Sequence, residues 1–270
     1  MKRLLFAVKY DIKYGIRYCF LLQFILFVFS FFSAYFMRIR IERINFKGNN
    51  ISIPNIFDSY INFWGGVKLN IDSNSIEIPI TWLTAITLIT MICYIYPVYQ
   101  LYGGAQAIIL RYGDRDVWWG SKCIWCVIQA IVSLFVINCG FAISSVGNSG
   151  YYIHSDILSY MKNINAQDTN FCKEYIFSIY LYVIMIVLVQ INLELRLGPI
   201  KSFIIVFLYN ILSVYVNNPF FIGNFAMLYK NKVLIENGYN SYLGSALCIL
   251  ISVISILSGI SYIKRKDILC

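Results

Sequence analysis

The sequence is poor in charged residues and contains a single histidine. Asp, Glu, Lys and Arg make up 13% of its 270 residues, whereas soluble globular domains contain about 25%. Hydrophobic residues make up 59%, which is more than one soluble core of this size can bury. These proportions exclude a water-soluble domain, and the apolar content excludes an intrinsically disordered chain. We expect an all-α membrane protein, because helices satisfy their own backbone hydrogen bonds in lipid.

Motifs that carry chemistry are also missing. The chain has no Gly-x-x-x-x-Gly-Lys-Ser/Thr phosphate-binding loop, so any ATP has to be bound by another polypeptide. Cys123 and Cys126 form a C-x-x-C pair without the second pair that a structural zinc site needs. His154 has only Asp156 nearby, and we interpret it as a solvated loop residue. We therefore predict no metal, no cofactor and no catalytic residues.

Six apolar stretches approach or exceed the roughly 20 residues that a spanning helix needs. We expect a single membrane domain over residues 1–270, with spans at 18–37, 79–102, 118–145, 175–193, 199–215 and 242–263. The fifth is the shortest and is followed by Asn217, Asn218 and Pro219, where a helix stops, so five spans is the alternative. The span centres carry no charged residue. This absence of buried charge argues against an ion-coupled carrier.

The basic residues predict the orientation, because short cytoplasmic loops retain Lys and Arg. With six spans both termini share a side, which carries thirteen Lys and Arg against five Asp and Glu, while the other side carries nine against eight. We expect a multi-pass protein of the cell membrane with both termini cytoplasmic. Arg38, Arg40 and Arg43 argue against this, since they directly follow the first span. The charges are spread in short clusters beside apolar runs, so no nucleic-acid partner is expected.

The N-terminal residues are too charged for a cleaved signal peptide, and we expect the first span to be retained. Apolar residues recur at every fourth position before it, and basic residues form a second stripe: Leu4, Val8, Ile12 and Ile16, then Lys9, Lys13 and Arg17. This pattern is typical of an amphipathic helix lying on the inner leaflet. An ordinary basic flank of the first span is the alternative.

The stretch between the second and third spans, residues 103–116, predicts a short cytoplasmic helix between two turns. Gly103 and Gly104 end the second span, and Gly113 with Asp114 gives a turn before the third. We call this stretch the elbow, and its candidate docking residues for a cytoplasmic partner are Ala105, Gln106, Ile109, Arg111, Tyr112, Asp114, Arg115 and Asp116. The alternative is a charged turn without a partner. In both cases Trp118 and Trp119 are expected at the lipid headgroups.

The apolar segment of residues 217–230 is too short and too interrupted to span. Either it dips into the outer leaflet and returns, lining an exit path, or it is an aromatic loop on the headgroups. Its candidate gate residues are Asn218, Pro219, Phe220, Phe221, Gly223, Asn224 and Met227. Four amides within the spans are candidate path-lining residues: Gln129, Asn138, Gln190 and Asn210. Hydrogen bonding between helices is the alternative role for these amides.

This layout resembles a known family, the ABC-2-type permeases of bacterial ATP-binding-cassette exporters, especially small ones of low-GC Gram-positive bacteria. The resemblance covers nearly the whole chain and rests on the basic N-terminal helix, the six spans, the elbow and the interrupted segment before the last span. Its most specific local match is Ile109 to Trp119, which looks like the arginine-glycine-arginine-tryptophan stretch of such permeases.

The resemblance implies that the elbow is a coupling helix docking on a separate ATPase subunit, and that Pro219 to Tyr229 is an outer re-entrant hairpin. It also implies a second permease subunit, identical or related, and a path through the lipid membrane for a bacteriocin-like peptide or another amphipathic substrate. The chain itself would not be an enzyme. The alternatives are a non-transporting accessory or immunity protein and a membrane-embedded enzyme, which would need clustered His, Glu or Asp.

Overall fold

The computed structural model describes residues 2–46, 51–67, 78–102, 114–146, 154, 156–157, 172–232 and 238–265. Across these ranges the regular structure is helical, and the β contact they contain is an isolated bridge between Asn231 and Tyr239. The helices are α1 (Lys2–Phe46), α2 (Ile56–Trp64), α3 (Ile80–Tyr102), α5 (Arg115–Ser144), α7 (Cys172–Leu197), α8 (Pro199–Tyr215) and α9 (Ser241–Arg265), with 3-10 helices η1 (Ile222–Ala226) and η2 (Leu228–Lys230). The expected all-α fold is confirmed.

Five of the described helices, namely α1, α3, α5, α7 and α9, are long and apolar enough to cross a membrane. The protein is therefore a helical membrane protein. The fifth predicted span is the apolar helix α8, which has the predicted bounds and 17 residues. At about 1.5 Å per residue it is roughly 25 Å long, somewhat less than the roughly 30 Å of a hydrocarbon core.

The N-terminal stretch and the first predicted span form one helix. α1 runs for 45 residues without a break, so no turn sets an amphipathic helix apart from the span at 18–37. The basic residues Lys9 and Lys13 are exposed, as expected. A stripe that the sequence pattern did not single out, containing Ala7, Asp11 and Gly15, is buried.

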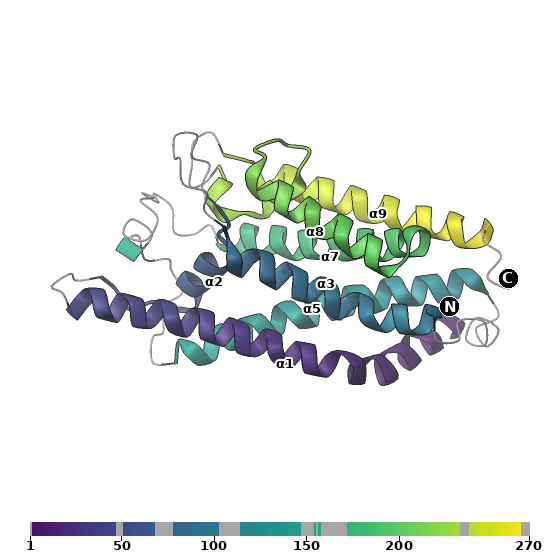
Figure 1. The fold of residues 1–270 in the computed structure, drawn as a ribbon, viewed down its shortest axis with the longest axis horizontal. Coiled ribbons are helices and arrows are strands. Elements are labelled where there is room, and N and C mark those ends of the chain that lie inside the picture. Colours follow the sequence, from purple (N-terminus) through teal and green to yellow (C-terminus); the bar gives the residue numbers. More distant parts are fainter. Residues whose placement is uncertain are drawn as a thin grey trace.

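The long helices lie side by side and alternate in direction (Figure 1). The start of α1, the start of α5 and the end of α9 lie together, and we call this the terminal end of the bundle. The opposite end, where α2, η1 and η2 lie, we call the far end. The most extensive helix contacts join α1 to α5 and α7 to α9, and α7 also packs on α3, α5 and α8.

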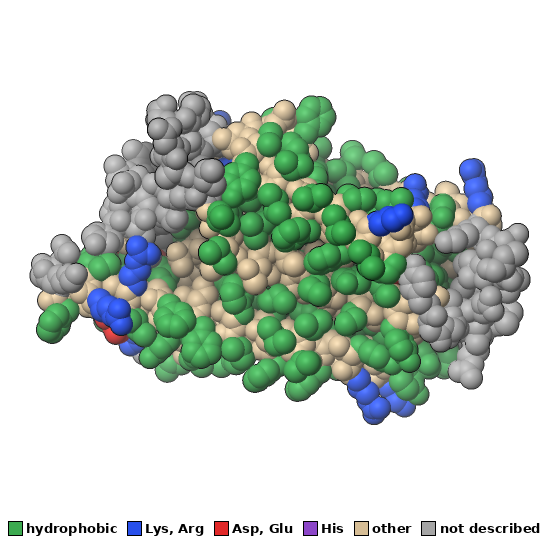
Figure 2. All heavy atoms as spheres, in the orientation of Figure 1, with side chains coloured by type: hydrophobic (Ala, Val, Ile, Leu, Met, Phe, Trp, Pro, Cys, Tyr) green, Lys and Arg blue, Asp and Glu red, His purple; other side chains and the backbone are tan. Residues whose placement is uncertain are grey.

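Figure 2 shows hydrophobic side chains over the middle of the bundle and Lys and Arg toward its two ends. Large apolar side chains are exposed on the helices at the edges of the bundle, such as Phe20 and Phe36 on α1 and Leu257 on α9. Monomeric soluble proteins rarely expose contiguous apolar patches this extensive. Lipid tails are the solvent that matches such a surface.

Candidate functional site

Two exposed ion pairs connect three segments that are distant in the sequence at the terminal end. Arg3 Nη1 lies 3.3 Å from Asp114 Oδ2, and Lys264 Nζ lies 2.9 Å from Asp116 Oδ2. The start of α1 and the end of α9 thus both meet the first turn of α5. All four side chains are largely exposed, so each pair contributes only about 0–1 kcal/mol. The pairs therefore mark where the three segments meet, but they add little to the stability of that contact.

This meeting point includes the last residues of the predicted elbow. Asp114 precedes α5, and Arg115 and Asp116 begin it. The other candidate docking residues lie outside the described residues: Ala105, Gln106, Ile109, Arg111 and Tyr112. The geometry therefore places the last part of the elbow at the terminal end.

The predicted position of Trp118 and Trp119 at the headgroups is wrong. Both are buried, at 2% and 1% exposure. The Trp119 indole nitrogen donates to the carbonyl of Ile256 at 3.1 Å, and its ring packs against Gly259. Trp119 fits against α9 because Gly259 has no side chain there. Both rings are therefore part of the packing between the helices.

A buried ion pair lies two turns into α5. Lys122 Nζ is 2.5 Å from Asp11 Oδ1, and both side chains are fully buried. The hydroxyl of Tyr96 on α3 donates to the same carboxylate oxygen at 2.9 Å. The ammonium also lies over the rings of Tyr96 and Trp118, 4.9 and 5.7 Å from their centroids. We call Asp11, Lys122, Tyr96 and Trp118 the Asp11–Lys122 cluster; it ties α1, α3 and α5 together at one point.

The predicted absence of buried charge is therefore wrong. Asp11, Lys122 and Glu194 belong to the charges that the predicted orientation counts on the side of the termini, and all three are buried, Glu194 at 2% exposure. One carboxylate oxygen of Glu194 has no hydrogen-bond partner among the described residues. Each of the three lies near a helix end, so the span centres remain uncharged as expected. Asp11 had one signal in the sequence: it shares a four-residue spacing with the small residues Ala7 and Gly15.

The four candidate path-lining amides lie at helix contacts. Three of them bond between helices: Gln23 Nε2 donates to Gln129 Oε1 (3.3 Å, α1 to α5), Asn138 Nδ2 to Tyr180 OH (3.1 Å, α5 to α7) and Tyr182 OH to Asn210 Oδ1 (2.5 Å, α7 to α8). Gln190 is 1% exposed, and its amide has no hydrogen-bond partner within the described ranges. Interhelical hydrogen bonding accounts for the three paired amides.

The segment expected to dip into the outer leaflet folds back over the far end. Residues 216–232, which we call the folded-back segment, include η1 and η2, and residues 222–231 are buried. The candidate gate residues divide into two groups. Asn218, Pro219 and Phe220 are exposed and Phe221 is half-buried, whereas the others are buried in the bundle: Gly223, Asn224 and Met227.

Lys230 fastens the folded-back segment to α8. Its ammonium donates to the carbonyls of Ser213 and Val214 at 3.2 and 2.8 Å and to Asn224 Oδ1 at 2.8 Å. The last carbonyls of a helix lack partners within it, and a positive charge there is favourable. Burial lowers the pKa of Lys230 to about 8, so the side chain is mostly charged at pH 7. Lys230 belongs to the charges that the predicted orientation counts on the side opposite the termini.

Glycines make room for this segment. A Cβ on Gly244 of α9 would lie 2.4 Å from the Cβ of Phe225, and one on Gly66 would lie 2.5 Å from Met227 Cγ. Gly66 also has φ of 74°, which favours glycine. The backbone of Tyr229 donates to the carbonyl of Gly65 at 2.9 Å. These close contacts leave the folded-back segment little room to move.

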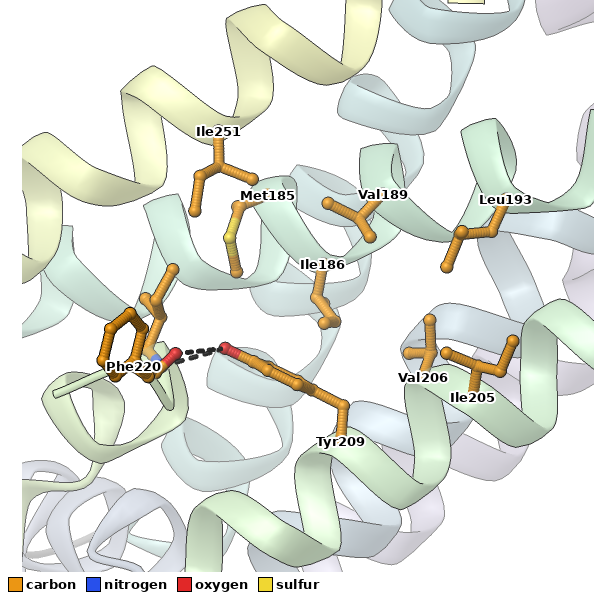
Figure 3. A pocket seen from close by; sticks show the side chains of 10 residues that line it. Met185, Ile186, Val189, Leu193, Ile205, Val206, Tyr209, Phe220 and Ile251 are labelled. Atoms are coloured by element: carbon orange, nitrogen blue, oxygen red, sulfur yellow. Dashed lines mark hydrogen bonds between the residues drawn. The ribbon is translucent and has the colours of Figure 1, made fainter. Parts of the chain in front are cut away.

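An apolar cavity of about 300 Å³ lies between α7, α8, α9 and the folded-back segment (Figure 3). Met185, Val189 and Leu193 of α7 line it together with side chains of α8 and α9: Ile205, Val206 and Ile251. Phe220 also lines it. The Tyr209 hydroxyl donates to the carbonyl of Phe220 at 3.4 Å and accepts from the backbone nitrogen of Ile222 at 2.9 Å. Tyr209 thus fixes the segment beside the cavity.

The interpretation of His154 as a solvated residue is wrong. Its Nδ1 lies 2.7 Å from Asp58 Oδ2, and its backbone nitrogen donates to Asp58 Oδ1 at 3.0 Å. The His154 side chain is 13% exposed. Asp58 belongs to the capping box of α2 with Asn55, and burial raises its pKa. The pair therefore joins α2 to a residue nearly a hundred positions later.

Among the described residues, no three His, Cys, Asp or Glu side chains come together as metal ligands. Cys123 and Cys126 are buried free thiols.

Comparisons of the chain with protein-family models, curated proteins and solved structures find no match. The fold defines the class of the protein as a multi-helix membrane protein.

Proposed function

We propose that the chain is the membrane subunit of an ATP-driven exporter of the ABC-2 type. One observation carries the proposal: the start of α1, the start of α5 and the end of α9 meet at the terminal end, where Arg3 pairs with Asp114 and Lys264 with Asp116. A partner docking on the elbow would touch the turn of α5 that contacts both the start of α1 and the end of α9. Its movement would reach several helices at once.

The proposed topology has six spans and cytoplasmic termini. α7 and α8 are joined through the single residue Gly198, so α8 returns toward the far end. The folded-back segment contacts the end of α8 through Lys230, and in this proposal α8 crosses the bilayer despite its short length. The terminal end is the cytoplasmic side in this proposal, because its loops hold the excess of basic residues.

The proposed mechanism is alternating access driven by the ATPase. Closure of the ATPase subunits would push the elbow and with it α5. The buried contact between Lys122 and Asp11 would pass this movement to α1. A second permease subunit, identical or related, would complete the path.

The proposed substrate is a peptide or another amphipathic molecule. The cavity beside α7 and α8 is almost entirely apolar, with Tyr209 as its polar group. Such a lining suits apolar side chains and excludes free ions. Phe220 would serve as the gate, since it lines the cavity and is 86% exposed.

Copurification tests the proposal. The chain is coexpressed with the ATPase encoded at the same locus and isolated in mild detergent, as wild type and with Arg111→Glu and Arg115→Glu combined. The control combines Lys9→Glu and Lys13→Glu, which reverses two exposed charges on α1. Wild type and control should retain the ATPase in fixed proportion, and the elbow variant should lose it while eluting as a single symmetrical peak.

The opposite results are equally informative. If wild type retains no ATPase, the transport proposal fails and a non-transporting accessory or immunity protein is favoured. If the elbow variant and the control lose the ATPase equally, docking depends on general positive charge, and the elbow is not the coupling element.

A further inference from the structure

A groove lies between α1, α2 and α3 at the far end, and its lining changes along α1 from aromatic side chains to Arg40. It has a volume of about 410 Å³. Its walls come from three elements: Phe29, Phe32, Ser33, Phe36, Met37 and Arg40 of α1, Asn62 of α2 and Thr81 of α3. The aromatic side chains lie along the deeper part of α1, and Arg40 lies nearest to the end of the bundle.

The groove has the length of one membrane leaflet. Phe29 and Arg40 are eleven residues apart on α1, which corresponds to about 16 Å along a helix. Half of a hydrocarbon core is about 15 Å thick. The centre of the predicted first span, 18–37, lies close to Phe29. If α1 crosses the bilayer with this centre, the deep part of the groove would lie near the midplane and Arg40 at the level of the headgroups.

Three polar side chains of the groove have unused hydrogen-bond donors, whereas the Thr81 hydroxyl donates to the carbonyl of Phe63 at 3.1 Å. In the described part of the chain, no hydrogen bond or ion pair is found for Arg40, for the Asn62 amide or for the Ser33 hydroxyl. Arg38 differs, because its Nε lies 3.0 Å from Glu42 Oε1. The cation at the mouth of the groove thus has no anion of the described chain to neutralise it.

We propose that this groove binds one phospholipid with an anionic headgroup. The phosphate would sit at Arg40, whose planar guanidinium pairs with phosphate oxygens, with Asn62 as a second donor. One acyl chain would lie along Phe29, Phe32 and Phe36. Charge complementarity selects this occupant: a purely apolar ligand would leave the guanidinium unpaired, and a free phosphate would leave the aromatic trough empty.

The site does not depend on transport. It needs only that α1 crosses a bilayer, and it lies at the far end, away from the elbow. The copurification experiment can therefore fail while the lipid site is present, and the reverse also holds.

Native mass spectrometry of the purified full chain tests the proposal, with lipids titrated in detergent. The probes are phosphatidylglycerol, phosphatidylcholine and glycerol 3-phosphate, which supplies the headgroup phosphate without chains. One phosphatidylglycerol should bind in preference to phosphatidylcholine, and glycerol 3-phosphate should not bind. Arg40→Gln should weaken phosphatidylglycerol binding about tenfold, the size of one charge-assisted hydrogen bond from this exposed side chain.

Two further variants separate the groove from general charge. Arg38→Gln removes the same charge two residues away, on the other side of α1 at 3.6 residues per turn, and should change binding less than about twofold if Arg40 acts as a specific donor. Ser33→Phe keeps Arg40 but fills the trough, and should abolish binding. Arg40→Lys should restore part of the affinity and shows that the site folds.

The proposal is overturned if Arg38→Gln weakens binding as much as Arg40→Gln, since binding would then follow surface charge. It is also overturned if phosphatidylcholine binds as tightly as phosphatidylglycerol, or if Ser33→Phe leaves binding unchanged.

Discussion

The two ends of the bundle are joined in different ways. At the terminal end, segments far apart in the chain meet through charge: Arg3 with Asp114, Lys264 with Asp116 and, deeper, Asp11 with Lys122. At the far end, the folded-back segment fits against glycines and caps α8 through Lys230. Exposed ion pairs are weak and separable, whereas close steric fits resist small displacements. The exposed pairs of the terminal end can thus separate at little cost, whereas the close contacts of the folded-back segment resist displacement.

The largest expected effect comes from breaking the buried charge pair. Asp11→Ala leaves the ammonium of Lys122 fully buried without its carboxylate, and we expect a loss of about 3–5 kcal/mol in the free energy of unfolding. Unfolding in detergent, followed by tryptophan fluorescence, measures this loss.

The control for this variant is the double substitution Asp11→Asn with Lys122→Gln, which removes both charges and should recover much of the stability. Arg3→Ala, which breaks an exposed pair, should cost less than about 1 kcal/mol. An Asp11→Ala variant as stable as Arg3→Ala would show that the buried pair does not hold the terminal end.

A smaller effect is expected from filling a glycine contact at the far end. Gly244→Ala places a Cβ 2.4 Å from the Cβ of Phe225, and such overpacking costs about 1–3 kcal/mol. Gly120→Ala is the matched control on α5, since its Cβ would lie 3.4 Å from Leu4 Cδ1. Thermal unfolding should show a lower midpoint for Gly244→Ala and an unchanged or higher one for Gly120→Ala, because alanine favours helix. Equal midpoints would show that the close fit at Gly244 does not stabilise the far end.

The smallest effect concerns the pH dependence at Lys230. Its pKa is about 8 in the fold against an ordinary value of 10.5, so between these values the unfolded chain binds more protons than the folded one. Stability then rises with pH in this window. Between pH 7 and 9.5, wild type should gain about 1–2 kcal/mol relative to Lys230→Met. A difference that stays flat, or that falls with pH, would contradict the buried position of this ammonium.

The helices were largely predictable from local signals. α8 begins at Pro199 and ends before Asn217-Asn218-Pro219, as expected, because proline at the first helical position and a following Asn-Asn-Pro sequence set its limits. The continuity of α1 was missed, since hydropathy marks only its middle. Its single interior glycine, Gly15, does not break the helix because the ring of Trp125 packs against it.

The contacts between distant residues were not predictable. Asp11 and Lys122 are 111 positions apart, and each looks like an ordinary flanking charge in its own segment. Lys230 and His154 likewise have sequence surroundings typical of loop residues, and their partners become visible only in the structure. Hydrophobic periodicity tells which face of a helix is buried, but it does not tell which charge on another helix will meet it.

The connection between α7 and α8 has a consequence for how the chain enters the membrane. Only Gly198 separates the two helices, and its φ of 86° turns the backbone sharply before Pro199. In the proposed six-span topology, two helices joined so closely would insert as one hairpin, with no intermediate in which only one of them crosses. The long apolar α7 would carry the shorter α8 through the bilayer during biosynthesis. Lengthening this turn with a flexible linker would uncouple the two insertion events and leave α8 dependent on its own modest length.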